Sequence, residues 1–115
     1  MMILANARYL DMADAMKRLG GMKSIYTGLL RKFLDNTEID ALRRAEAAGN
    51  NKEIGESAHA IKGLAANLSL PALTEAAAAL NTAMRNGEAP GALPQGVYDA
   101  WEKTKTVIED TLKDG

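Results

Sequence analysis

One short segment of the chain, SAHAIKGLAANLSL at residues 57–70, places a histidine, a lysine and a glycine within little more than one helical turn. His59 is the only histidine among the 115 residues. Histidine ordinarily has a pKa of about 6.5, so near pH 7 most imidazole rings keep a nitrogen lone pair free for nucleophilic attack. Lys62 lies three residues further on, which on a helix places its ammonium beside the ring. A free nucleophile next to a cation is suited to carrying a phosphoryl group, whose charge is about -1.5 to -2.

The direction of the His59 side chain follows from the period of the helix that this segment predicts. At about 100° per residue, the apolar residues gather on the side opposite the histidine. These residues are Ile54, Ala58, Ile61, Ala65 and Leu68. Four small or basic residues share the side of the histidine, and Glu56 borders them: Gly55, Lys62, Gly63 and Ala66. The pattern therefore predicts that His59 projects into solvent.

The two glycines on this side of the helix favour a functional site. A glycine within an exposed helix costs roughly 0.5–1 kcal/mol relative to alanine, and Gly55 and Gly63 both carry that cost. Together with Ala66 they would leave a flat strip on which another molecule could approach the ring. The alternative is a surface histidine without a role, and it would not explain the glycines.

Composition excludes several other classes of protein. The chain has no cysteine, which excludes disulfides, thiol catalysis and cysteine-based zinc sites. The 14 basic and 15 acidic residues give a net charge of -1, which predicts neither a nucleic-acid nor a membrane partner. No window approaches the roughly 20 apolar residues of a membrane span. The amino terminus, MMILANARYLDMAD, is also too briefly apolar for a signal peptide. We therefore expect a cytoplasmic protein.

The rest of the chain predicts an all-α fold. Helix formers dominate, and apolar residues recur at the three-and-four spacing of amphipathic helices. The expected helices cover residues 10–19, 22–34, 52–68, 71–84 and 97–112, and the second either continues to residue 48 or is interrupted at 35–37. Short connections between long helices predict an antiparallel four-helix bundle with a short additional helix at its amino-terminal end. We expect one domain over residues 1–115.

Three finer predictions concern individual residues. The spacing in the second helix predicts a buried stripe that contains Met22, Ile25, Tyr26, Leu29, Leu30, Phe33 and Leu34. Ser69, just before Pro71, is predicted to cap the fourth helix. Trp101 is predicted to lie in the core as part of the apolar side of the last helix.

At His59 the residues match a known pattern. AHAIKGLAANLSL resembles the H-x-x-K-G motif of the histidine-containing phosphotransfer (HPt) domain of two-component phosphorelays. RLGG before the second helix, AEAAGN before the histidine helix and LNTAMRNGE after it also resemble segments of that family. The chain departs from the family pattern at Ser69, where glycine is frequent.

The resemblance implies a carrier without a kinase motif of its own. By position, His59 would be phosphorylated, Lys62 would lie near the phosphate, and Gly63 would admit the partner. Gly55, Glu56, Ala66 and Asn67 would contact that partner. The partner would be a response-regulator receiver domain, with a hybrid sensor kinase as a further candidate. The resemblance implies no cofactor or metal in this chain, and it places Mg²⁺ and an aspartate on the receiver.

Two other functions are open to the sequence. An enzyme with His59 as general base would need a carboxylate to orient the ring, and Glu56 is the nearest candidate. A non-catalytic interaction module would instead bind a signalling partner through alanine-rich and methionine-bearing surfaces. Its candidate contact residues are Met12, Met16, Met22 and Met84, although methionine at helical spacing more often fills a core.

Overall fold

The computed structural model describes residues 7–114, and all regular secondary structure within that range is helical. The helices are α2 (Met12–Arg18), α3 (Lys23–Leu34), α4 (Glu38–Ala47), α5 (Asn51–Asn67), α6 (Pro71–Arg85) and α7 (Leu93–Asp114). Residues 1–6 and 115 lie outside the described range. Two predictions therefore lie partly outside the described residues. One is the absence of a signal peptide, which was judged from the amino-terminal segment MMILANARYLDMAD, and the other is the extent of the single domain, residues 1–115.

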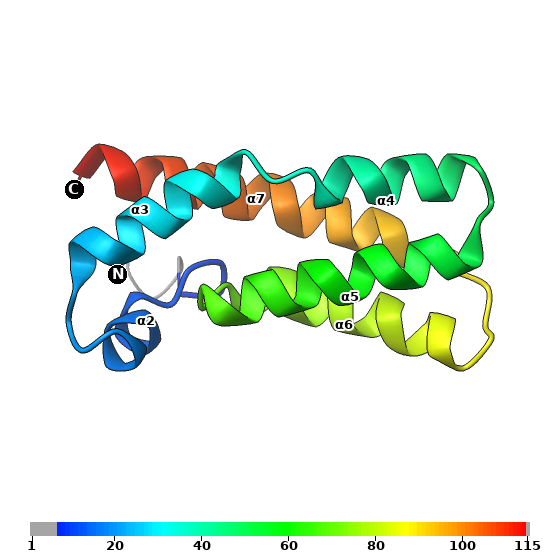
Figure 1. Cartoon of the computed structure of the whole chain (residues 1–115), viewed down its shortest axis with the longest axis horizontal. Helices are drawn as coiled ribbons and strands as arrows, with labels where there is room; N and C mark the ends of the chain where they lie inside the picture. The colour runs from blue at the N-terminus through cyan, green and yellow to red at the C-terminus, as the bar shows by residue number, and fades with distance from the viewer. Residues whose placement is uncertain (1–6, 115) are drawn as a thin grey trace.

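The long helices form an antiparallel bundle, as predicted. Helices α3 and α4 follow one another along its length and together make one of its four rods, while α5, α6 and α7 make the others (Figure 1). Helix α5 packs mainly against α6 and α4, and α6 packs against α7. The short helix α2 lies at one end of the bundle, as expected of the additional amino-terminal helix (Figure 1).

The interruption at residues 35–37 is real, and Asn36 explains it. Its Nδ2 donates a hydrogen bond to the Phe33 carbonyl oxygen at 2.7 Å, and its Oδ1 accepts one from the Glu38 N–H at 3.0 Å. One side chain thus binds a carbonyl in the last turn of α3 and a free N–H at the start of α4. The two helices are therefore separate.

The core lies between all the long helices of the bundle, α3 to α7, and contains the residues predicted to face away from His59. Ile54, Ala58, Ile61 and Ala65 are buried, as are their neighbours Leu73, Ala77 and Leu80 from α6. Trp101 is buried as predicted, and its ring meets that of Phe33 edge to face with centroids 5.4 Å apart. Small side chains at Ala58, Ala65 and Ala77 let α5 and α6 approach closely.

The predicted stripe of α3 is wrong in part. Met22, Ile25 and Leu29 are exposed, at 55%, 47% and 40% of their surface. They share one side of the helix, whereas Tyr26, Leu30 and Phe33 occupy the buried side. The apolar residues of this segment cover more of the helix circumference than the neighbouring helices do, so three of the seven remain exposed.

The predicted cap at Ser69 is also wrong, because Ser69 belongs to the end of α5. Its φ angle is 57°, in the left-handed region that favours glycine. The Leu70 N–H donates back to the Ala65 carbonyl oxygen at 2.9 Å, as in a helix end of the Schellman type. Leu70 takes the cap position of α6 without a side-chain hydrogen bond. The conformation explains why glycine would suit position 69.

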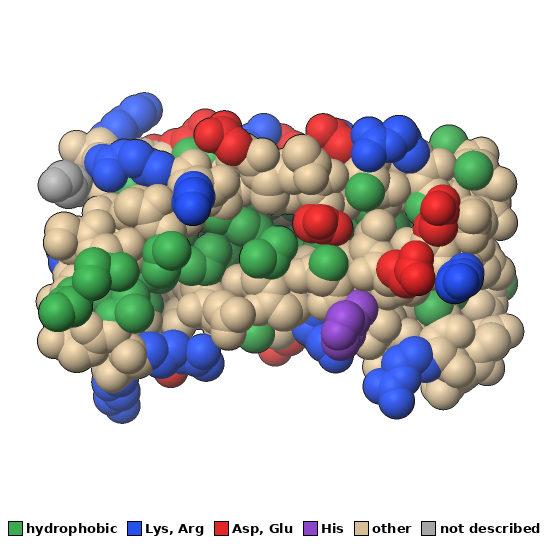
Figure 2. Space-filling model, in the orientation of Figure 1, with side chains coloured by type: hydrophobic (Ala, Val, Ile, Leu, Met, Phe, Trp, Pro, Cys, Tyr) green, Lys and Arg blue, Asp and Glu red, His purple; other side chains and the backbone are tan. Residues whose placement is uncertain are grey.

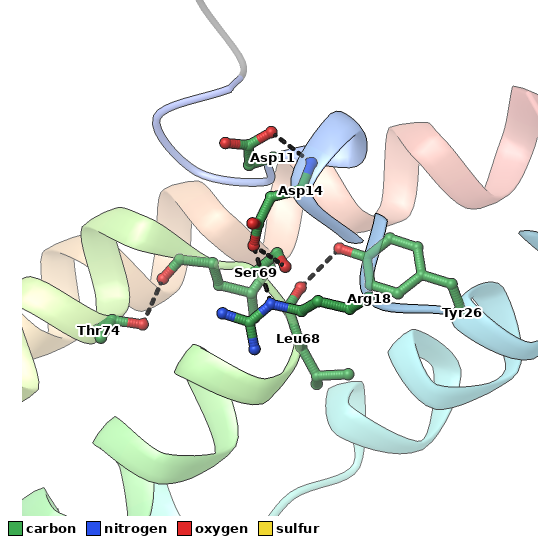
Figure 3. Close-up of polar contacts among 8 residues, drawn as sticks. Asp11, Asp14, Arg18, Tyr26, Leu68, Ser69 and Thr74 are labelled. Atoms are coloured by element: carbon green, nitrogen blue, oxygen red, sulfur yellow. Dashed lines mark hydrogen bonds and ion pairs between the residues drawn. The ribbon is translucent and has the colours of Figure 1, made fainter. Parts of the chain in front are cut away.

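The Ser69 hydroxyl instead fastens α2 to the turn between α5 and α6 (Figure 3). It donates to Asp14 Oδ2 at 2.7 Å, and Arg18 Nε donates to the same oxygen at 3.1 Å. The hydrogen bond from Ser69, together with the Arg18 guanidinium, holds the pKa of Asp14 below its usual range. These contacts offset part of the cost of a serine in the left-handed conformation.

Tyr26 connects α3 to the same turn (Figure 3). Its hydroxyl donates to the Leu68 carbonyl oxygen at 2.7 Å, and only 1% of the residue is exposed. Burial raises the pKa of Tyr26, because the charged phenolate would lose its hydration. The ring packs in the core while the hydroxyl satisfies a carbonyl at the end of α5.

We predict that Tyr26→Phe lowers the free energy of unfolding by roughly 1–3 kcal/mol, because the Leu68 carbonyl would lose a partner away from water. Urea denaturation followed by circular dichroism measures the change. Tyr98→Phe is the matched control, since the Tyr98 hydroxyl binds Glu46 Oε1 at 2.7 Å in an exposed setting. Tyr98→Phe should lower the free energy of unfolding by less than Tyr26→Phe does. An equal loss of stability in both variants would contradict the importance of the buried hydrogen bond.

Candidate functional site

His59 lies near the middle of α5 and is exposed, on the side of the helix opposite its buried residues. It is visible on the surface in Figure 2. Among the hydrogen bonds found within residues 7–114, none involves the imidazole ring. A reacting group from another molecule can therefore reach the ring without displacing a side chain of the bundle.

A shallow groove between α5 and α6 includes His59 in its wall. The groove is lined by Asn51, Lys52, Gly55, Glu56, His59, Asn81, Met84 and Arg85. Lys52 and Arg85 bring two positive charges and Glu56 one negative charge, and basic side chains stand beside the histidine in Figure 2. This surrounding favours an anionic group on the ring.

Lys62 lies on the α6 side of the histidine helix and is half-buried. Its Nζ is 3.5 Å from Oδ1 of Asn81, in α6. The ammonium is thus held at the junction of the two helices, one turn of α5 beyond His59.

The two glycines differ in their surroundings. A methyl group added at Gly63 would meet no atom within 4 Å, so the surface there is open, as predicted. A methyl group added at Gly55 would lie 3.2 Å from Cβ of Met84, and Gly55 is half-buried. Gly63 thus flattens the exposed side of α5, whereas Gly55 also allows α6 to pack closely.

The structure separates the other residues predicted to contact a partner. Glu56 is exposed and lies between the groove of His59 and a second groove against α4. Ala66 is half-buried in a hollow beside α2, and Asn67 lines a groove between α3 and α5. Gly55 and Glu56 therefore lie with His59, while Ala66 and Asn67 lie further towards the α2 end.

Exposed apolar side chains form a strip on the same face of the molecule as His59. The apolar strip consists of Met22, Ile25, Leu29 and Leu64, and Figure 2 shows hydrophobic side chains extending from the α2 end towards the middle of this face. Leu29 and Leu64 also line the groove between α3 and α5. An exposed apolar surface of this kind often marks a site of protein interaction.

Sequence reasoning missed three polar or basic residues that line the groove of His59. Asn81 and Arg85 come from α6, and Lys52 lies almost two turns before His59. A usable signal exists for Asn81, which is a polar residue at a position where the apolar spacing of α6 predicts burial. No local pattern points to the other two.

Residues 28–110 match the family model of the Hpt domain. This range covers well over half of the 115 residues and includes His59, Lys62 and Gly63. The chain belongs to the Hpt domain family. Hpt domains are phosphotransfer carriers of two-component signalling rather than kinases, and they work with receiver domains of response regulators. The resemblance stated from the sequence is confirmed.

Helix α2 precedes the range that the Hpt model matches. No curated protein and no solved structure matches the chain. None of the helices in residues 7–114 is long and apolar enough to cross a membrane. The same residues contain no group of three or more histidine, cysteine, aspartate or glutamate side chains that could hold a metal ion.

We predict opposite outcomes for alanine at the two glycines. Gly63→Ala should raise the free energy of unfolding by roughly 0.5–1 kcal/mol, because it improves helix propensity in open space. Gly55→Ala should gain less or lose stability, because the new methyl group would press on Met84. Thermal unfolding of the two variants measures the difference. A larger gain at Gly55 would contradict the close packing of α5 and α6.

Proposed function

We propose that His59 carries the phosphoryl group of this Hpt domain, accepting it from an aspartate of a receiver domain and passing it to another. The observation that supports this most is the position of the only histidine, exposed on a side of α5 that Gly63 leaves open. The H-x-x-K-G motif lies inside the range that matches the family.

The proposed step is an in-line displacement at phosphorus. A free lone pair of the His59 imidazole attacks the acyl phosphate of the receiver, an N–P bond forms, and the P–O bond to the aspartate breaks. The aspartate leaves as a carboxylate, and the proton on the other ring nitrogen stays with the phosphorylated ring or passes to water. Passing the group onward reverses these bonds with a second receiver.

The neighbours of His59 would support this step by charge and by shape. Lys62, with Lys52 and Arg85 in the groove, would offset part of the phosphoryl charge. Gly63 would let the receiver approach the ring closely. The receiver would supply Mg²⁺ as well as the aspartate, and positioning and the metal would provide most of the rate, as in phosphoryl transfer generally. We also propose that the protein works in the cytoplasm. A hybrid sensor kinase is a further proposed partner.

We predict that His59→Gln keeps the fold and abolishes labelling. The exposed ring makes no contact that the core needs, so the unfolding temperature should change little. The protein is mixed with a Mg²⁺-bound receiver domain charged by a small phosphodonor, and phosphate on the protein is measured. The label on the unmodified protein should be acid-labile and stable in base, and it should be absent from the variant.

Lys105→Gln is the control for that experiment, since it changes a polar side chain of α7 away from the groove of His59. It should label normally. Label that persists in His59→Gln would show that another residue carries the phosphate. If His59→Gln leaves partner binding and signalling unchanged, the alternative of a non-catalytic interaction module is right instead.

The apolar strip supports a receiver domain as the partner. The apolar strip and His59 lie on the same face of the molecule, so a protein seated over the histidine would also cover part of the strip (Figure 2). Covering apolar surface would bring the binding energy that an exposed helix side without a pocket lacks.

We predict that Leu64→Glu raises the receiver concentration needed for half-maximal transfer by about ten-fold, because burial of a leucine contributes about 1.5–3 kcal/mol. The rate at saturating receiver should change little. Leu93→Glu is the matched control, since Leu93 is 37% exposed and Leu64 is 39% exposed, but Leu93 starts α7. Equal effects of the two substitutions would contradict docking over the strip.

A further inference from the structure

Asn81 is a buried polar side chain next to the groove of His59. Only 7% of it is exposed, and it comes from α6, whose neighbouring residues Leu80 and Ala83 are also buried. A polar side chain in such a place needs hydrogen-bond partners, because an unpaired buried amide costs free energy. Both of its partners lie on α5.

The two contacts of Asn81 agree on the orientation of its amide. Nδ2 donates to the Gly55 carbonyl oxygen at 3.3 Å, and a carbonyl can only accept. Oδ1 faces Lys62 Nζ at 3.5 Å, and an ammonium can only donate. A flipped amide would place like groups together on both sides. The carbonyl of Asn81 is therefore directed at Lys62.

The contact with Gly55 also ties Asn81 to the turn that bears the histidine. In an α-helix the carbonyl of residue 55 is the acceptor for the backbone N–H of residue 59, and α5 spans both. The close packing of Gly55 against Met84 brings α6 near enough for a side chain as short as asparagine to reach that carbonyl. Asn81 is thus placed by the backbone beneath His59.

We propose that Asn81 is a positioning residue that holds the Lys62 ammonium beside His59, where the phosphoryl group would be bound. This inference rests on the proposed function of His59. A lysine side chain has many rotamers, and the acceptor fixed by α5 restricts them to the α6 side of the histidine. Because the amide is neutral, it orients the ammonium without cancelling its charge.

A double-mutant cycle tests this role. The rate of transfer from a Mg²⁺-bound receiver, at saturating receiver, is measured for the unmodified protein, Asn81→Ala, Lys62→Ala and the double variant. Asn81→Ala should slow transfer several-fold, and Lys62→Ala at least as much. The double variant should be no slower than Lys62→Ala alone, because Asn81 acts through Lys62. An equal slowing by Asn81→Ala with and without Lys62 would overturn the proposal and indicate a structural role.

Asn81→Asp separates position from charge. The carboxylate is close to the amide in shape and keeps an acceptor for Lys62, but it loses the donor to the Gly55 carbonyl, and its negative charge would offset that of the ammonium. Transfer should therefore be slower than in the unmodified protein although the lysine stays in place. Transfer at the unmodified rate would overturn the argument that a neutral acceptor matters.

NMR of the lysine side chains gives a measurement that does not depend on phosphate. The Cε and Nζ signals of Lys62 should move towards those of freely exposed lysines in Asn81→Ala, and should not move in Asn86→Ala, a change at an exposed residue after α6. Thermal unfolding of each variant shows that it is folded.

The two proposals fail in different ways. Absence of phosphate on His59 in the unmodified protein would overturn the proposed function and the link between Asn81 and transfer. An unchanged Lys62 signal in folded Asn81→Ala would overturn the positioning role even where His59 is phosphorylated.

Discussion

Burial of one side of α5 determines where the histidine points. Ile54 and Ile61 are each 1% exposed. Ala58 and Ala65, which are fully buried beside them, have small side chains that let the neighbouring helices approach. Burying an isoleucine contributes about 1.5–3 kcal/mol, so turning α5 to bury His59 would forfeit that contribution twice. The exposure of the ring is therefore a consequence of the core, and any substitution that loosens this side of α5 also loosens the site.

The histidine stands between two surfaces of different character. On its α6 side lie the charged and polar groups, with Lys62 held by Asn81 and Arg85 nearby. On its α3 side lies apolar surface that begins at Leu64. The charged and polar surface would stabilise an anion on the ring. The body of a partner protein would cover the apolar surface. Separate surfaces allow affinity for the partner and stability of the phosphorylated ring to vary independently.

The elements of the fold were predictable where one helix contains the information. The helical period alone places His59 opposite the buried residues, since positions within a helix are fixed relative to one another. The break before α4 stayed open, because apolar residues continue at helical spacing while Asn36 ends α3 through its side-chain contacts. The burial of Ile25 and Leu29 was predicted wrongly, because spacing shows which residues share a side but not whether another element covers it.

The site was less predictable than the fold, because it depends on contacts between helices that are far apart in the sequence. Asn81 lies 26 residues from Gly55 and 19 from Lys62, so no local pattern connects them. Ser69 likewise gives a misleading signal, because a serine before a proline predicts a helix cap while its partner Asp14 is 55 residues away. A polar residue at a predicted core position is nevertheless an informative signal in the sequence. Because a buried polar side chain needs a hydrogen-bond partner, it must lie where another element supplies one. Applied to α6, that argument singles out Asn81 and directs attention to the helix that packs against it, which is the helix of the histidine.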